Sequence, residues 1–161
     1  IQGGPLMHII AAKAICFHEA LQPSFSVYQK QVIRNSACLA TALQQCGFRI
    51  VSGGTDNHLM LVDLRPKGVT GKDTATALDQ ADITVNMNLI PFDPEKPTVA
   101  SGIRVGTAAV TTRGMTEPQM RQIAKLMADV ADHIGNQDVY AAVRQEVGRL
   151  TGQFPMPQFW S

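Results

Sequence analysis

Arg104 is the residue in this sequence with the clearest potential for chemistry. It lies in the segment 101–107, whose other residues are small or apolar and which has a glycine on either side of the arginine. Glycines let a ligand or another backbone approach closely, and a guanidinium can hold a carboxylate through paired hydrogen bonds. Alternatively, Arg104 is a strand residue that faces solvent, and the sequence leaves both interpretations open.

Three other segments give weaker chemical signals. Gly3 and Gly4 precede a predicted helix, where backbone N–H groups could bind a phosphate or simply form a turn. Asp56 and His58 could act as a base and its orienting group, but a turn held by local side-chain hydrogen bonds is favoured. The proline-rich loop 86–94 is typical of functional loops without indicating a ligand. No histidine or cysteine pair has metal-site spacing, so no metal is predicted.

Composition narrows the class of protein. The 161 residues include 14 basic and 13 acidic side chains, a formal charge of +1, which argues against nucleic-acid binding. The apolar runs are shorter than the roughly 20 residues of a membrane span, and no signal peptide opens the chain. Three cysteines without CxxC spacing are expected to be small buried residues in a reducing cytoplasm. The start without Met suggests a boundary inside a longer polypeptide.

The elements that must position these residues follow from hydrophobic periodicity and turn signals. Pro23 is expected to break the first helix, and Ser24 to cap the second. Thr116 and Gln119 predict a capping box. Helices are predicted over 5–21, 24–46, 70–82, 117–134 and 137–150, and strands over 48–52, 58–64, 83–87 and 103–107. This order indicates an α/β two-layer sandwich with helices on one face.

Three segments, 2–8, 52–58 and 101–107, together resemble serine hydroxymethyltransferase in order and spacing. The resemblance runs from Gln2 to about Pro157. It implies a cytoplasmic fold-type-I enzyme that uses pyridoxal 5'-phosphate (PLP) to interconvert serine and glycine, passing the one-carbon unit to tetrahydrofolate. Family members are dimers or dimers of dimers.

The same resemblance implies a domain plan for this chain. Residues 1–22 would end the PLP-binding large domain, 23–47 would be a connecting helix, and 48–157 would be the small C-terminal α/β domain. Residues 158–161 form a tail outside the resemblance.

Specific roles follow from the resemblance, residue by residue. Arg104 matches the arginine that holds the substrate carboxylate, and Asn88 matches an asparagine near the folate pterin. Gly3 and Gly4 match glycines that reach the PLP phosphate of the neighbouring subunit. Arg113 matches a second arginine, expected to be structural.

This chain lacks one motif of the family and departs from the family pattern at one residue. The Schiff-base lysine motif is expected upstream of Ile1, and no lysine of this chain lies in such a motif, so the chain alone is expected to be inactive. Ala108 stands where the family usually has proline, and this replacement is expected to loosen the turn beside Arg104.

The alternative to an enzyme part is a non-catalytic α/β binding or regulatory module. Retention of Arg104, Gly3 and Gly4 favours the enzyme part.

Overall fold

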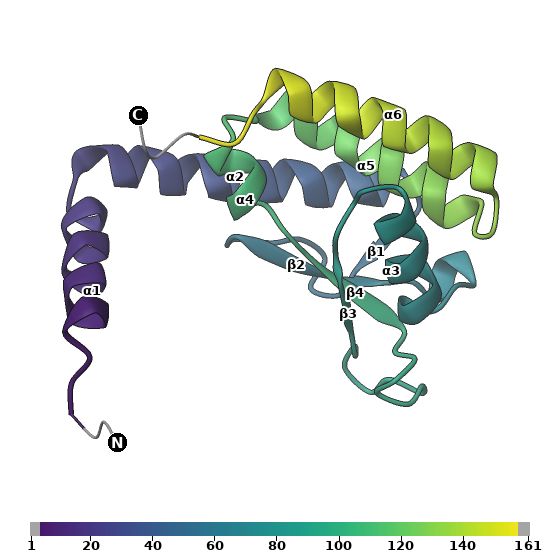
Figure 1. The fold of residues 1–161 in the computed structure, drawn as a ribbon. Coiled ribbons are helices and arrows are strands. Elements are labelled where there is room, and N and C mark those ends of the chain that lie inside the picture. Colours follow the sequence, from purple (N-terminus) through teal and green to yellow (C-terminus); the bar gives the residue numbers. More distant parts are fainter. Residues whose placement is uncertain (1–3, 158–161) are drawn as a thin grey trace.

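The computed structural model describes residues 4–157 as a two-layer α/β fold with one projecting helix (Figure 1). The helices are α1 (Met7–Ala20), α2 (Pro23–Gln45), α3 (Gly71–Gln80), α4 (Ala108–Thr112), α5 (Glu117–Asp132) and α6 (Gln137–Gln153), with a 3-10 turn η1 (Arg65–Lys67). The strands are β1 (Arg49–Ile50), β2 (Leu59–Asp63), β3 (Asn86–Asn88) and β4 (Gly102–Gly106). The predicted fold class is therefore confirmed.

The strands form one antiparallel sheet in the order β1-β2-β4-β3. Helix α2 packs on β1 and β2, α3 packs on β3 and β4, and α5 and α6 complete the helical layer on the same side (Figure 1). Alternate residues of the central strands are buried against this layer, among them Val62 and Ile103, which are fully buried. The residues between them point to the opposite face, which no helix of the described chain covers.

Local signals in the sequence account for several helix ends. Thr116 and Gln119 form the predicted capping box at the start of α5. Gly47 and Gly135 have φ values of +83° and +90°, so each ends a helix in a conformation that favours glycine. Pro23 is the first residue of α2, not a break before a Ser24 cap, because a first-turn proline loses no helical hydrogen bond.

Other predictions differ from the structure. The third strand lies at Asn86–Asn88 and not at 83–87, because pairing with β4 fixes its position. The short helix α4 was not predicted, since its five residues give too little periodicity. Among the cysteines, Cys16 is exposed and the other two are half-buried, so the expectation of buried thiols is wrong for Cys16.

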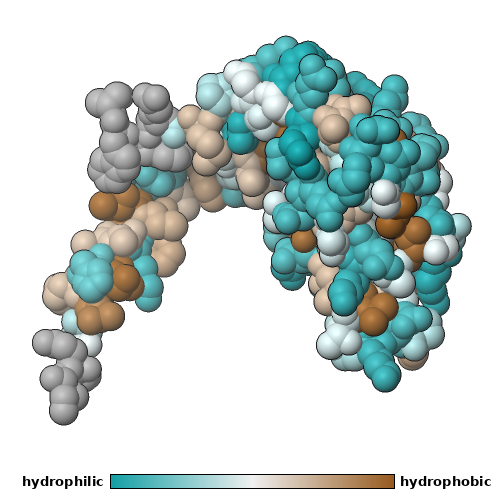
Figure 2. Space-filling model, turned by 45° about the vertical axis from the view of Figure 1, so that its right-hand side comes forward, coloured by the Kyte–Doolittle hydropathy of each residue, from teal (hydrophilic) through white to brown (hydrophobic). Residues whose placement is uncertain are grey.

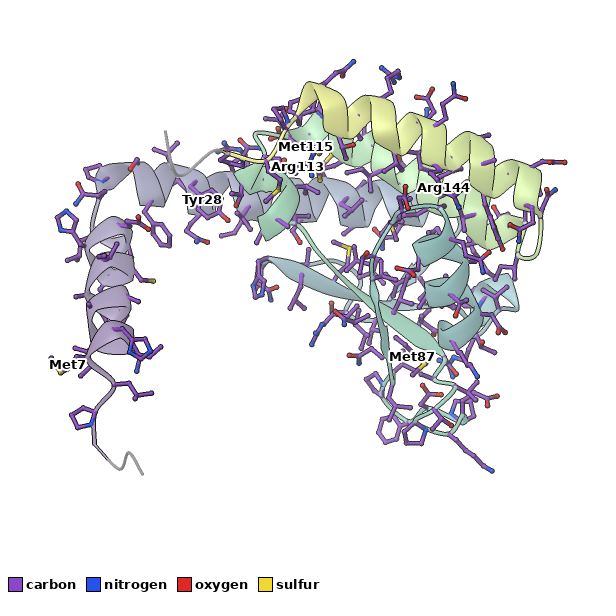
Figure 3. The ribbon with its side chains drawn as sticks, in the orientation of Figure 1. Met7, Tyr28, Met87, Arg113, Met115 and Arg144 are labelled. Carbon is purple, nitrogen blue, oxygen red and sulfur yellow. The ribbon has the colours of Figure 1, made fainter. Side chains whose placement is uncertain are left out.

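Helix α1 projects from the fold at a steep angle to α2 (Figure 1). None of its residues is buried, although it is rich in large apolar side chains. Ile15 and Phe17 are 62% and 65% exposed. Figure 2 shows hydrophobic residues on the visible side of this arm, and Figure 3 places Met7 near its free end. A helix that is apolar all round is typically a buried one, so α1 presents an unpartnered apolar surface.

The helices of the described chain include none with the length and apolar character needed to cross a membrane.

Candidate functional site on the open face of the sheet

Strand pairing brings two predicted site residues together on one face of the sheet. In β4, Arg104 lies opposite Leu61 of β2 and Asn86 of β3. Gly102, two residues earlier, lies opposite Asn88. Paired residues of antiparallel strands share a face, as do residues two apart along one strand. Arg104, Asn86 and Asn88 therefore share the face that the helices leave uncovered.

The guanidinium of Arg104 is exposed and has one hydrogen-bond partner among the described residues. Its Nη2 donates to Oδ1 of Asn86 at 3.3 Å, and no described carboxylate lies within ion-pair distance. Carboxylates pair with other arginines of the described chain, namely Arg34, Arg49, Arg65, Arg144 and Arg149. Among the described residues Arg104 thus has no counter-charge and faces solvent, and its carboxylate-binding role stays a prediction.

Gly102 keeps the strands beside Arg104 close together. A Cβ atom at this position would lie 2.6 Å from Cγ2 of Ile90, 2.8 Å from the Val62 carbonyl oxygen and 3.0 Å from the Asn88 carbonyl oxygen. Gly71, at the start of α3, is equally restricted, because its Cβ would lie 2.4 Å from the Gly102 carbonyl oxygen. The sequence suggested close approach at the glycines flanking Arg104, but it gave no signal for Gly71.

Asn88 lies where β3 ends and the proline-rich loop begins. The side chain is half-buried, and its Nδ2 donates to the Leu89 carbonyl oxygen at 2.7 Å. Its Oδ1 accepts no hydrogen bond from the described residues. The amide is thus anchored at one end and can still accept from a ligand, and its predicted folate contact stays a prediction.

Asp93 closes the loop that follows Asn88. Its carboxylate accepts hydrogen bonds from the Ser101 hydroxyl at 2.6 Å, the Ser101 amide at 2.9 Å, the Ile90 amide at 3.0 Å and the Glu95 amide at 2.9 Å. Burial acts to raise the pKa of Asp93, but these hydrogen bonds outweigh it and hold the pKa well below its usual range. The sequence identified the loop but missed Asp93, whose partners lie up to eight residues away.

A second carboxylate, that of Asp63, links β2 to the arginines beside it on the β1 side of the sheet. Asp63 is 1% exposed and lies opposite both Arg49 and Gly102 across the sheet. It accepts hydrogen bonds from Arg49 Nη1, from Arg65 Nη2 at 2.8 Å and from the Arg65 amide at 3.0 Å. Sequence reasoning missed this group, because the arginines have no distinctive spacing from Asp63.

The segment 55–58 is a turn. Thr55 Oγ1 donates to the Leu59 carbonyl oxygen at 2.6 Å, and the Leu59 amide donates to Asn57 Oδ1 at 3.0 Å. Asp56 and His58 are exposed, and the described structure has no hydrogen bond between them. The favoured turn interpretation is therefore supported over a base with its orienting group.

Arg113 lies apart from the open face, beneath the end of α6 (Figure 3). Its Nε donates to the Phe154 carbonyl oxygen at 2.6 Å, and its Nη2 donates to the Thr151 carbonyl oxygen at 2.9 Å. These carbonyls belong to the C-terminal end of α6, where cations stabilise the helix. The contacts support the structural role expected for Arg113.

The described residues do not form a PLP site by themselves. Gly3 lies outside the described residues. Gly4 is exposed, and no atom lies within 4 Å of the place its Cβ would occupy, so nothing here shapes a phosphate cradle. Lys67 is paired with Asp132 at 2.6 Å and lies over the Phe48 ring, and the remaining lysines are exposed. Residues 4–157 also contain no cluster of side chains suited to a metal ion.

Comparison with known proteins gives the family. The family model described as serine hydroxymethyltransferase matches residues 1–127. A serine hydroxymethyltransferase of Leptospira biflexa is 54% identical over 99% of this chain and 38% of its own length. Those of Myxococcus xanthus and Verminephrobacter eiseniae are 54% and 56% identical over 97% of this chain. The chain thus spans about 38% of the length of these relatives. The family model and these identities show that this chain belongs to the serine hydroxymethyltransferase family.

Proposed function

We propose that this chain is the C-terminal part of an enzyme that interconverts serine and glycine and transfers the one-carbon unit to tetrahydrofolate. Within it, Arg104 binds the α-carboxylate of the amino-acid substrate. The observation that carries this proposal is an arginine on an open sheet face without a carboxylate partner among the described residues. An arginine whose charge is not neutralised by neighbouring carboxylates is suited to a carboxylate ligand.

The sheet supports this role by fixing where the guanidinium can lie. Arg104 is in the central part of β4, between β2 and β3, and not on a loop. A planar fork held by a paired strand fixes the direction of the carboxylate, and thereby the orientation of the bonds at the substrate Cα. A lysine ammonium at the same position would supply the charge without that direction.

Asn88 would serve the second substrate. It shares the open face with Arg104 and lies on the neighbouring strand, so a folate bound there would be close to the amino acid. Its Oδ1 accepts no hydrogen bond from the described residues and could accept one from an N–H group of a pterin ring. We propose this contact as the origin of folate selectivity on this side of the site.

PLP would be held mainly by segments that the longer relatives have and this chain does not span. The cofactor would supply the electron sink for bond cleavage, whereas this chain supplies the residues that bind and orient the substrates. Gly3 and Gly4 would approach the PLP phosphate of a neighbouring subunit in a homodimer or dimer of dimers. A cytoplasmic location belongs to the same proposal.

The test uses the full-length enzyme that contains this chain, with Arg104→Lys and Arg104→Ala. We expect weaker serine binding in Arg104→Lys. For Arg104→Ala we expect a loss on the order of 3 kcal/mol, or roughly a hundredfold. Arg149→Lys is a matched control, because Arg149 is an exposed arginine of α6 paired with Glu146, and it should bind serine normally.

Bound PLP and thermal stability should be unchanged in the Arg104 variants, because an exposed side chain contributes little to packing. Near-normal serine affinity in Arg104→Ala would refute the carboxylate role. Loss of PLP together with unfolding would instead show that Arg104 is structural.

A further inference from the structure

Asn86 lies beside Arg104 and begins the segment 86–94, which the sequence indicated as a functional loop without assigning a role to Asn86 itself. It opens β3 and is paired in register with Arg104 of β4. Its Oδ1 accepts the 3.3 Å hydrogen bond from Arg104 Nη2, and among the described residues no other group accepts from this guanidinium. The side chain of Asn86 is exposed and is not part of the buried core.

The partner of Arg104 is uncharged, whereas several other arginines of the described chain pair with carboxylates. Arg121 also lacks a carboxylate partner, but it lies on α5 and contacts the Cys38 sulfur. Arg49 and Arg65 share the carboxylate of Asp63, and Arg149 pairs with Glu146. In each of these cases the guanidinium is at least partly neutralised. The amide oxygen of Asn86 can fix the direction of the Arg104 side chain without adding a negative charge.

A neutral hydrogen-bond acceptor beside Arg104 can order its side chain before the substrate carboxylate binds. A long arginine side chain loses rotamer freedom when it binds a ligand, and that loss weakens binding unless the side chain is already ordered. One hydrogen bond to Asn86 uses one of several N–H donors and leaves others for an incoming carboxylate. An aspartate at the same position would order the side chain equally well but would compete with the substrate for its charge.

We infer that Asn86 is a positioning residue, which orients the Arg104 guanidinium and, being neutral, leaves its positive charge for the substrate carboxylate. This inference rests on the proposed function of Arg104. Asn86 itself need not touch the substrate. The geometry that carries the inference is the in-register pair on adjacent strands together with the single hydrogen bond between the two side chains.

The test compares Asn86→Ala and Asn86→Asp in the full-length, PLP-loaded enzyme by calorimetric titration with L-serine. We expect the dissociation constant to rise about threefold to tenfold in Asn86→Ala, because the ordering hydrogen bond is lost. In Asn86→Asp it should rise well beyond tenfold, because an internal carboxylate then occupies the guanidinium. The control is Asn136→Asp, the same change at the exposed cap of α6, where both residues cap equally well.

L-Serinamide, which lacks the carboxylate, separates this role from a structural one. Asn86→Asp should bind serinamide as well as the unmodified enzyme does, whereas a general distortion of the site would weaken both ligands. In an Arg104→Ala background, Asn86→Asp should have no further effect on serine binding, because the guanidinium that residue 86 would pair with is absent.

The outcomes distinguish this inference from the proposed function. If Arg104→Ala binds serine normally, the proposed function fails. If Arg104→Ala loses serine but both Asn86 variants bind it within twofold of the unmodified enzyme, the positioning role alone is wrong. Equal weakening of serine and serinamide by Asn86→Asp would also overturn it. If Asn86→Asp does not fold, the test rests on Asn86→Ala, titrated with both serine and serinamide. The positioning role is then wrong if Asn86→Ala binds serine within twofold of the unmodified enzyme.

Discussion

Asp63 should make the stability of this chain depend on pH in a way that one substitution removes. Its carboxylate is buried between two arginines. Hydrogen bonds from the Arg65 side chain lower the pKa of Asp63 from 3.8 to about 2, with burial opposing this and the Arg65 amide and Arg49 adding to it. The difference between 3.8 and about 2 corresponds to about 2 kcal/mol of folding free energy.

The sign follows from the direction of the change. The folded state lowers the pKa, so the stabilisation is complete above the unfolded value near 3.8 and is lost as the pH falls through about 2. At pH 3 about half of the stabilisation, or about 1 kcal/mol, should remain. Asp93 has its pKa lowered in the same direction, so the chain as a whole loses stability in acid, and only a difference between variants isolates Asp63.

The perturbation is Asp63→Asn, which keeps the size of the side chain and removes its charge. We expect the variant to be less stable by about 2 kcal/mol at pH 7 and by about 1 kcal/mol at pH 3. The assay is urea unfolding of the chain followed by circular dichroism at pH 7, 5 and 3. Asp129→Asn, at an exposed position of α5, is the control and should change stability by less than about 0.5 kcal/mol at each pH.

Two results would refute the reasoning about Asp63. If Asp63→Asn lowers the unfolding free energy by less than about 0.5 kcal/mol at pH 7, the arginine hydrogen bonds only offset the unfavourable burial of the carboxylate. A larger difference that does not shrink between pH 5 and pH 3 would mean that the substitution acts through packing and not through charge.

Three further outcomes are expected. In the full-length enzyme, Asn88→Ala should slow folate-dependent turnover and spare folate-independent cleavage of a β-hydroxy amino acid, whereas an equal loss in both assays would make Asn88 structural. The chain alone, treated with PLP and borohydride, should give no single dominant lysine adduct by mass spectrometry, since its described lysines are exposed or paired with Asp132; one specific adduct would contradict this. The chain alone should also self-associate through the apolar arm α1, and Phe17→Glu should weaken this, as measured by sedimentation equilibrium; a monomer at every concentration would count against it.

Much of the architecture could be predicted from local sequence signals. The capping box of α5 and the glycines that end α2 and α5 act within a few residues, so the helix ends they set were visible in the sequence. Features set by partners elsewhere were not visible. Strand β3 lies at its observed position because β4 offers it hydrogen bonds there, and composition had favoured a segment a few residues earlier.

The site divides in the same way. The sequence by itself indicated Arg104, flanked by glycines, as a candidate carboxylate ligand, and the resemblance implied its role along with that of Asn88. Only the tertiary structure decided that both share the open face, that Asn86 orients Arg104 and that Asp63 and Asp93 hold the surrounding strands and loop. These contacts join residues on different strands and loops, and the register that brings them together depends on burial of one sheet face against the helices, not on the spacing of the residues along the chain.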